Sequence, residues 1–184
     1  MIIQKLDTYK LPKNFRGRNA FIVQLWWIIQ GVFFRNSPQF MYGFRNFLLR
    51  SFGAKIGSNV IIRPTVRVTY PWRVSIGDYC QIGDDVVLYS LGEIEIGNNT
   101  VISQKSYICA ASHDYEKSTF NIFSKKVTIK DQCWLATDVF VGPGVTIEQG
   151  TVVGARSSVY KDLPGNKVCK GNPAKIIRDR VSVK

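Results

Sequence analysis

The sequence predicts an all-β solenoid, a parallel β-helix of about five coils, with a helical segment before it and a short helix after it. Three observations support this prediction. From Ile56 onward an aliphatic residue recurs every six positions, a small residue usually follows it, and the departures from this spacing come at equivalent places. A period of six is neither the two of an ordinary strand nor the 3.6 of a helix. Each six-residue unit should therefore supply one short strand and one corner.

The repeat is explicit in short phrases along the chain. They read IGSNVI from Ile56, IGDYCQ from Ile76, IGDDVV from Ile82, IGNNTV from Ile96, VGPGVT from Val141 and VGARSS from Val153. The aliphatic residue should point into a narrow prism, and the small residue should let the backbone turn sharply at the corner. Three units make one coil of 18 residues, and successive coils must stack because no coil buries its aliphatic residues alone.

The aliphatic positions form five triplets, one for each expected coil. They are Ile56, Ile62, Val68; Ile76, Ile82, Leu88; Ile96, Ile102, Ile108; Ile129, Leu135, Val141; and Ile147, Val153, Val159. Their first members are 20, 20, 33 and 18 residues apart, so 2, 2, 15 and 0 residues are added to an 18-residue coil. Every addition follows a third unit. All excursions should therefore leave from one edge of the prism, and residues 114–126 should form an extended arm.

The repeat divides the chain into three parts: an apolar and basic segment at 1–55, the solenoid at 56–163, and a tail at 164–184. Within the first part, Asn19–Phe34 is a run of sixteen uncharged residues between Arg18 and Arg35. As a helix it would span about 24 Å, which is less than the about 30 Å core of a bilayer. Two alternatives remain open: a helix that covers the first coil, or peripheral contact of residues 19–52 with a membrane interface.

The net charge, the cysteines and the single histidine limit the kinds of ligand and cellular environment that we expect. The formal net charge is +12, and residues 1–50 carry eight lysines and arginines against Asp7 alone. Such a surface attracts nucleic acid, an anionic membrane or phosphorylated small molecules, and charge does not choose among them. The cysteines are scattered without a CxxC pair, which favours reduced thiols in a cytoplasmic protein. With one histidine in the chain we expect no metal site, because zinc takes three or four ligands.

His113, the only histidine, is the candidate catalytic residue. It is the sixth residue of the unit that begins at Ile108, directly before the expected arm. Sites are often found where loops leave a rigid scaffold, and a neutral imidazole can take a proton from a hydroxyl that attacks a thioester. Glu93 holds the same position one coil earlier, so we expect it near His113 as a second catalytic residue that orients the ring. The alternatives are a structural histidine and a solvated glutamate.

The end of the chain offers cations for phosphate groups. Asn172 and Pro173 predict the N-cap and first residue of a short helix. Lys175 and Arg178 would then share one helical face. With Lys161 from the last coil they could neutralise phosphates, although a solvated basic tail is the alternative.

Several of these features together resemble the hexapeptide-repeat acyltransferase family over residues 56–180. They are the repeat units, the arm after the histidine, the run WLATDVFVGPGVTIEQGTVVGARSSV and the closing GNPAKIIR. More narrowly, the whole chain is similar to colanic acid biosynthesis acetyltransferases in FRGRNAFIVQLWW, SFGAKIG, YPW and SQKSYICAASHD. The resemblance implies a left-handed solenoid. The spacing itself does not give this hand, since parallel crossovers are usually right-handed.

The resemblance also implies an activity: an O-acetyltransferase that moves an acetyl group from acetyl-CoA to a sugar hydroxyl. The implied protein is a cytoplasmic homotrimer with clefts between its prisms, and its acceptor is an exopolysaccharide unit, free or lipid-linked at the inner membrane face. His113 takes the base position, and Trp134 and Asp85 are assigned to the substrate side. The coenzyme side falls on Thr137, Ala155, Lys161, Lys175 and Arg178. An acceptor-holding asparagine of the galactoside branch aligns with Gly83, so that pocket is not transferred.

Other functions are compatible with some of these features. A non-catalytic trimeric scaffold or a polyanion-binding solenoid is the main alternative, because a fold does not determine a function. A carbonic anhydrase on the same solenoid would need three histidines around zinc. An acyl-enzyme through Cys109, four residues before His113, is a further alternative. Nucleic-acid binding is not expected, because the sequence has no motif of stacking aromatic residues.

Overall fold

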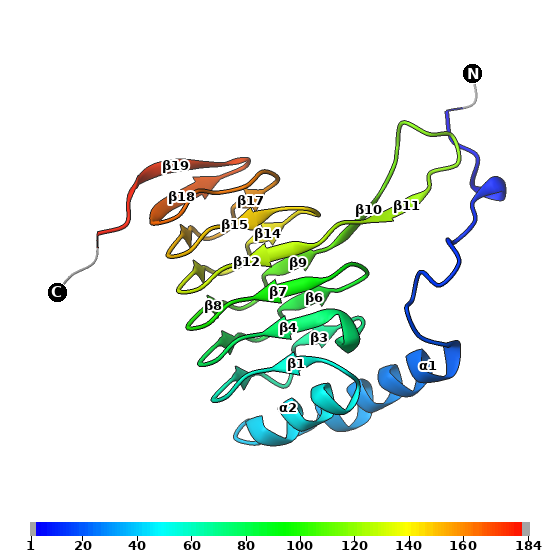
Figure 1. Cartoon of the computed structure of the whole chain (residues 1–184), viewed down its shortest axis with the longest axis horizontal. Helices are drawn as coiled ribbons and strands as arrows, with labels where there is room; N and C mark the ends of the chain where they lie inside the picture. The colour runs from blue at the N-terminus through cyan, green and yellow to red at the C-terminus, as the bar shows by residue number, and fades with distance from the viewer. Residues whose placement is uncertain (1–2, 182–184) are drawn as a thin grey trace.

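A computed structural model describes residues 3–181 and shows a left-handed parallel β-helix with helices at one end (Figure 1). The elements before the solenoid are η1 (Leu6–Thr8), α1 (Ala20–Ile29), the π-helical turn η2 (Gln30–Phe34) and α2 (Tyr42–Ser51). The side chain of Asn19 caps α1 by accepting a hydrogen bond from the N–H of Ile22 (3.0 Å). The expected helix over Asn19–Phe34 is therefore present, with a π-helical last turn.

Three sheets form the faces of the prism. Sheet A contains β1 (Lys55–Ile56), β4 (Val74–Ile76), β7 (Ile94–Ile96), β12 (Val127–Ile129) and β15 (Thr146–Ile147). Sheet B contains β2 (Ile61–Ile62), β5 (Gln81–Ile82), β8 (Val101–Ile102), β13 (Trp134–Leu135), β16 (Val152–Val153), β18 (Lys167–Gly171) and β19 (Ala174–Asp179). Sheet C contains β3 (Arg67–Val68), β6 (Val87–Tyr89), β9 (Tyr107–Cys109), β14 (Phe140–Val141) and β17 (Ser158–Val159).

The coil count is slightly larger than predicted. Five coils each contribute a strand to all three sheets within residues 3–181. A bridge from Leu163 to Ile147 and strand β18 then begin a sixth. The fifteen aliphatic residues of the five triplets are all buried. The predicted core is therefore confirmed position by position.

The small residue after the aliphatic one has a different reason from the one predicted. A Cβ on Gly97 would lie 2.2 Å from Oδ1 of Asp131, and one on Gly77 would lie 2.5 Å from Oδ1 of Asn98. These oxygens accept hydrogen bonds from backbone N–H groups of the coil below, Asp131 from Asn98 (2.7 Å) and Asn98 from Asp78 (2.8 Å). The glycine therefore makes room for a ladder of polar side chains. The left-handed backbone comes two residues later, as at Asn99 (φ 53°).

The helices cover the open edge of the first coil. A terminal coil exposes strand N–H and C=O groups that have no neighbour in the solenoid, and side chains of α1 and α2 donate to its carbonyls. The pairs are Asn46 Nδ2 to Val60 (2.8 Å), Arg45 Nε to Ile62 (2.7 Å) and Trp26 Nε1 to Val68 (2.8 Å). Arg45 is fully buried, and desolvation lowers its pKa.

The predicted C-terminal helix is wrong. Residues 167–179 form an antiparallel hairpin of β18 and β19, which turns at Gly171 (φ 112°). Strand β18 extends sheet B through the pair Val168 and Val152, and β19 then pairs with the edge that β18 exposes. Asn172 and Pro173 therefore lie in a turn between two strands and do not start a helix.

Lys175 and Arg178 nevertheless share a face of this hairpin. Lys175 pairs with Lys170 and Arg178 pairs with Val168, because the register shifts by one residue between these pairs. Residues two apart on β18 point to the same side, and cross-strand partners share that side. The two cations are thus brought together by a β-bulge in place of a helical turn.

All excursions leave from the edge between sheets C and A, as predicted. They are the turn η3 (Pro71–Arg73), the loop at 90–93, and the arm formed by β10 (Ala111–His113) and β11 (Ile122–Ser124). The arm begins earlier than expected. The carbonyl of Ala110 accepts a hydrogen bond from the N–H of Lys125 (3.0 Å) and closes the base of the arm. His113 therefore lies on the arm and not on the prism.

Replacing Arg45 with alanine should destabilise the protein strongly. The variant leaves the buried carbonyl of Ile62 and the Oγ of Ser37 without their donor, and each unsatisfied buried acceptor costs about 1–3 kcal/mol. We expect a loss of about 3 kcal/mol in the free energy of unfolding, measured with urea at fixed protein concentration. Arg35→Ala, at an exposed position of the same segment, should cost less than about 0.5 kcal/mol. Equal losses in both variants would contradict this account of the first coil.

Candidate active site

The arm holds the imidazole of His113 in one orientation. Nδ1 of the half-buried ring lies 2.8 Å from the backbone carbonyl oxygen of Phe120, across the ribbon. A carbonyl oxygen only accepts hydrogen bonds, so Nδ1 carries the proton and Nε2 of the neutral ring is left as the base. The ring of Phe120 stacks on the imidazole, with centroids 4.3 Å apart and planes 7° apart. The geometry therefore suits His113 for accepting a proton through Nε2.

Side chains of the arm line an open depression of about 480 Å³ around His113. Asp114 is adjacent in sequence, but its carboxylate pairs with Lys117 at 3.1 Å. The hydrogen bond from Lys117 lowers the pKa of Asp114. Asp114 is thus engaged within the arm, and the partner at Nδ1 of His113 is the Phe120 carbonyl.

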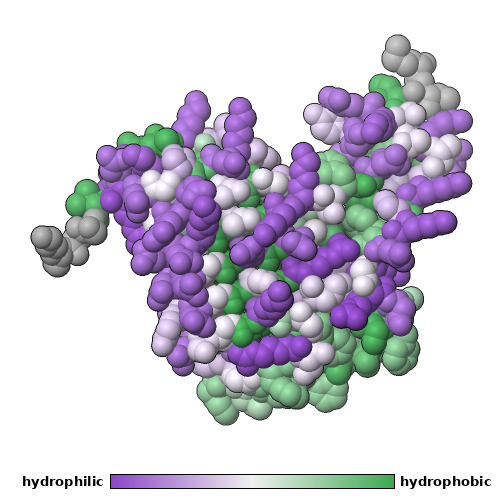
Figure 2. Space-filling model, viewed as in Figure 1, coloured by the Kyte–Doolittle hydropathy of each residue, from purple (hydrophilic) through white to green (hydrophobic). Residues whose placement is uncertain are grey.

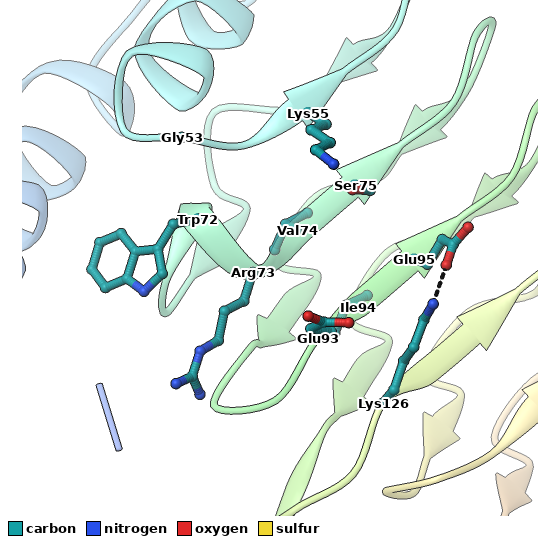
Figure 3. Close-up of a pocket in the computed structure, with 10 residues that line it drawn as sticks. All are labelled: Gly53, Lys55, Trp72, Arg73, Val74, Ser75, Glu93, Ile94, Glu95 and Lys126. Carbon is teal, nitrogen blue, oxygen red and sulfur yellow. Dashed lines mark ion pairs between the residues drawn. The ribbon is translucent and has the colours of Figure 1, made fainter. Parts of the chain in front are cut away.

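The expectation that Glu93 lies beside His113 is wrong. Ile94 pairs with Val127 in the next coil, so the residue that stacks on Glu93 is Lys126. The reason is that the arm inserts residues 111–124 before the chain returns to sheet A. Figure 3 shows Glu93 on the outer face of sheet A, near Lys126 and Arg73. Lys126 itself forms an ion pair with Glu95.

Trp134 and Arg178 lie in one row on the outer face of sheet B. The register runs from Trp134 through Val152 and Val168 to Arg178. Trp134 is 47% exposed, and its Nε1 donates to the Oγ of Ser103 (3.0 Å). Lower on the same face, an open groove of about 440 Å³ runs past β2, β5 and β8. This face combines an aromatic side chain, a groove and a cationic end.

The remaining assigned residues lie at the edges of the prism. Thr137 and Ala155 occupy successive coils at the edge between sheets B and C, where the N–H of Arg156 donates to the carbonyl of Thr137 (2.9 Å). Asp85 lies lower on that edge, with a left-handed backbone (φ 58°). Lys161 follows β17 and is exposed at the edge between sheets C and A.

One chain therefore does not bring the predicted site residues together. His113 leaves from the edge between sheets C and A, and in a three-sided prism this edge is opposite sheet B. Trp134 and Arg178 are on sheet B, so within one chain they face away from the arm. A site that uses both groups needs two copies of the chain.

The geometry disfavours Cys109 as a nucleophile. Its Sγ lies 3.0 Å from the carbonyl oxygen of Ala111, and burial raises the pKa of the thiol. The thiolate is the reactive form, so a raised pKa leaves less of it at neutral pH. Among residues 3–181, no three His, Cys, Asp or Glu side chains are grouped so that they could hold a metal ion.

Two residues that contact His113 were missed at the level of sequence. Phe120 supplies both the carbonyl and the stacked ring, and the ring of Tyr9 lies beside the imidazole, tilted by 50° with a centroid distance of 6.0 Å. Neither residue belongs to the six-residue repeat. Their only signal in the sequence is that they are aromatic residues outside the repeat.

Known proteins resemble this chain along almost all of its length. No protein-family model matches it. A protein of Escherichia coli strain K12, described as colanic acid biosynthesis acetyltransferase WcaF, is 60% identical over 179 residues, which cover 97% of this chain and 98% of that protein. The galactoside O-acetyltransferase of the same organism is 28% identical over 138 residues, or 73% of this chain and 68% of that one.

A solved structure shares the fold. It is the hexapeptide-repeat acetyltransferase VCA0836 of Vibrio cholerae in complex with acetyl-CoA, with a TM-score of 0.79. The alignment covers 90% of this chain and 92% of that protein, at 24% sequence identity. The fold is therefore common to both.

Proposed function

Because the chain belongs to the family of colanic acid biosynthesis acetyltransferases, we propose that it transfers an acetyl group from acetyl-CoA to a sugar hydroxyl of an exopolysaccharide. The observation that supports this most directly is the bond between Nδ1 of His113 and the carbonyl of Phe120. This bond selects the tautomer whose Nε2 can act as a general base.

Acetyl-CoA would supply a thioester, whose carbonyl carbon is the electrophile. Nε2 of His113 takes the proton from the sugar hydroxyl as its oxygen attacks that carbon. The Phe120 carbonyl then stabilises the imidazolium through Nδ1, and the ring can return the proton to the departing sulfur. Such a base contributes about 10²- to 10⁴-fold to the rate. The rest would come from holding donor and acceptor in place.

The residues of sheet B and its edge fit the coenzyme. Lys175 and Arg178 share one face of the hairpin and can pair with phosphate oxygens. Trp134, which is assigned to the substrate side, offers an exposed aromatic surface lower in the same row. Thr137 and Ala155 would line the path between them along the neighbouring edge, and Asp85 would lie on the acceptor side. Lys161 is at the edge between sheets C and A, which carries the arm. It would therefore reach the site from the subunit that supplies His113.

The acting unit in this proposal is a homotrimer with shared sites. His113 of one subunit would face sheet B of the next, since a single prism places the two on opposite sides. A closed ring of three heterologous contacts repeats this arrangement three times. The groove between two prisms would then hold both substrates.

The helical segment at one end of the solenoid, the base of the molecule, has a surface that favours a membrane-bound acceptor. Large apolar side chains project outward from the helical segment, and Figure 2 shows them as a continuous apolar surface at that end. They are Phe21, Trp27, Ile28, Val32, Phe33, Phe40 and Phe47. Between Thr8 and Gly77 the chain has eleven lysines and arginines and no aspartate or glutamate.

This combination fits the cytoplasmic face of an anionic membrane. Nothing among residues 3–181 is a helix of the length and apolarity needed to cross a bilayer. The contact would therefore be interfacial, through residues 19–52, and it would suit a lipid-linked acceptor.

His113→Asn should lower kcat by at least about a hundredfold, because no other group replaces Nε2 as the base. Release of coenzyme A thiol with acetyl-CoA and saccharide acceptors measures this, and binding of coenzyme A should be retained. Cys109→Ala is the matched control from the strand below the arm, and it should keep near-normal activity. If the histidine variant stays active while the cysteine variant does not, the proposed chemistry is wrong.

Shared sites predict that two inactive chains complement each other. One carries His113→Asn, and the other carries Lys175→Glu with Arg178→Glu. In randomly mixed trimers about a quarter of the sites would combine an intact histidine with an intact sheet B, since each half is intact with a probability of about one half. Co-expressed chains should regain roughly that share of wild-type activity. A site contained within one chain would regain none, as would a control mixture of His113→Asn with His113→Ala.

The membrane proposal predicts sedimentation with vesicles that contain phosphatidylglycerol, and much weaker binding to phosphatidylcholine alone or at high salt. Phe21→Asp combined with Phe40→Asp should weaken binding at least about tenfold, because each change exposes a charge where an apolar ring met the lipid. Tyr115→Asp is the matched control: it is 76% exposed, against 78% for Phe40, but lies on the arm. Equal effects of both variants, or no preference for anionic vesicles, would refute this contact.

A further inference from the structure

The segment before α1 forms a strap, defined here as residues 3–18, along the edge that carries the arm. Figure 1 shows it running from the base of the molecule to the tip of the β10 and β11 ribbon. It is fastened at both ends. Trp72 Nε1 donates to the carbonyl of Arg16 (2.8 Å), and the N–H of Lys5 donates to the carbonyl of Ser118 in the arm (2.7 Å).

A second, smaller core lies under the strap. Its buried residues are Val23, Tyr70, Leu91 and Ala111, and Phe15, Trp72, Tyr89 and Ile122 pack against them. These side chains come from the strap, from α1, from all three excursions of the solenoid and, with Tyr89, from strand β6. The guanidinium of Arg73 also lies over the ring of Phe15, 5.9 Å from its centroid. The strap is therefore part of the packed structure on the catalytic edge.

Tyr9 lies between the two fastened ends and contacts the histidine. Its half-buried ring is tilted by 50° to the imidazole of His113, with centroids 6.0 Å apart. The imidazole is thus packed by Phe120 from the arm and by Tyr9 from the strap, while Nδ1 is bound to the Phe120 carbonyl. Rotation of the imidazole away from this carbonyl would have to displace one of the two rings.

We propose that Tyr9 is a positioning residue for His113. This inference rests on the proposed role of His113 as the base. Tyr9 acts through its ring: it keeps the imidazole in the rotamer and tautomer that leave Nε2 available. The phenol hydroxyl is not required. The coenzyme residues lie on sheet B, away from the strap, so loss of Tyr9 should affect the chemical step and not the binding of acetyl-CoA.

The test compares Tyr9→Ala with Tyr9→Phe. Removal of the ring should lower kcat about 10- to 100-fold, because misplaced catalytic groups lose rate on this scale. The KM for acetyl-CoA should stay unchanged. Tyr9→Phe should keep near wild-type kcat, and so should Tyr79→Ala, which removes a 60% exposed ring at the edge between sheets A and B. An unchanged kcat in Tyr9→Ala, or equal damage in Tyr9→Phe, would overturn the proposal.

A second readout does not depend on activity. Because His113 is the only histidine, every imidazole signal in a nitrogen-15 spectrum belongs to it. The spectrum therefore gives the tautomer of His113 directly. Wild type and Tyr9→Phe should show the neutral ring protonated at Nδ1, and Tyr9→Ala should show a mixture of tautomers. An identical spectrum in Tyr9→Ala refutes the positioning role. Activity retained in His113→Asn would instead refute the proposed function, so the two failures are distinguishable.

Discussion

Most strands of this β-helix are two or three residues long, so none is stable by itself and each depends on hydrogen bonds to the coils above and below. The inward residues alternate with outward ones, and stacking buries them as one continuous column from Ile56 to Cys169. Such a column has two open ends. Arg45 and Asn46 satisfy the carbonyls of the first coil, and β19 pairs with the last strand of sheet B. Side chains thus cover the first coil, and a strand covers the edge of sheet B at the other end.

The need for each coil to stack on its neighbours also limits where the chain can carry a functional loop. A coil that must stack on both sides tolerates extra residues only at a corner, where no strand pairing is interrupted. In this chain all the excursions use the corner between sheets C and A, and their side chains meet in the second core around Tyr70 and Leu91. The arm with His113 is thus supported by its own packing. Its rigidity comes from the Phe120 stack and from the hydrogen bond between Ala110 and Lys125.

Much of the fold could be predicted from the sequence because the six-residue period reports burial directly. The start of the arm was harder to predict, since a count along the chain cannot tell whether an insertion begins before or after His113. The prediction that Glu93 lies beside His113 was wrong for this reason. The C-terminal helix failed because Asn172 and Pro173 are signals for both a helix start and a tight turn. The unpaired edge of β18 favoured the strand, and Ile176 and Ile177 have strand propensity. The contact between Tyr9 and His113 could not be predicted from the sequence, because it joins two segments that lie outside the repeat.

The helical segment carries two kinds of apolar residue that need separate explanations. Trp26 is buried and donates to the first coil, whereas Trp27, the next residue, points outward from the base. The solenoid is already covered by the inward set, so its stability does not account for the outward set. A large apolar surface that the fold does not need indicates a nonaqueous neighbour. The chain between Thr8 and Gly77 contains no aspartate or glutamate, which favours an anionic lipid surface. The strap leaves this same segment and ends on the arm, so one continuous stretch of chain connects the proposed membrane contact with the proposed base, His113.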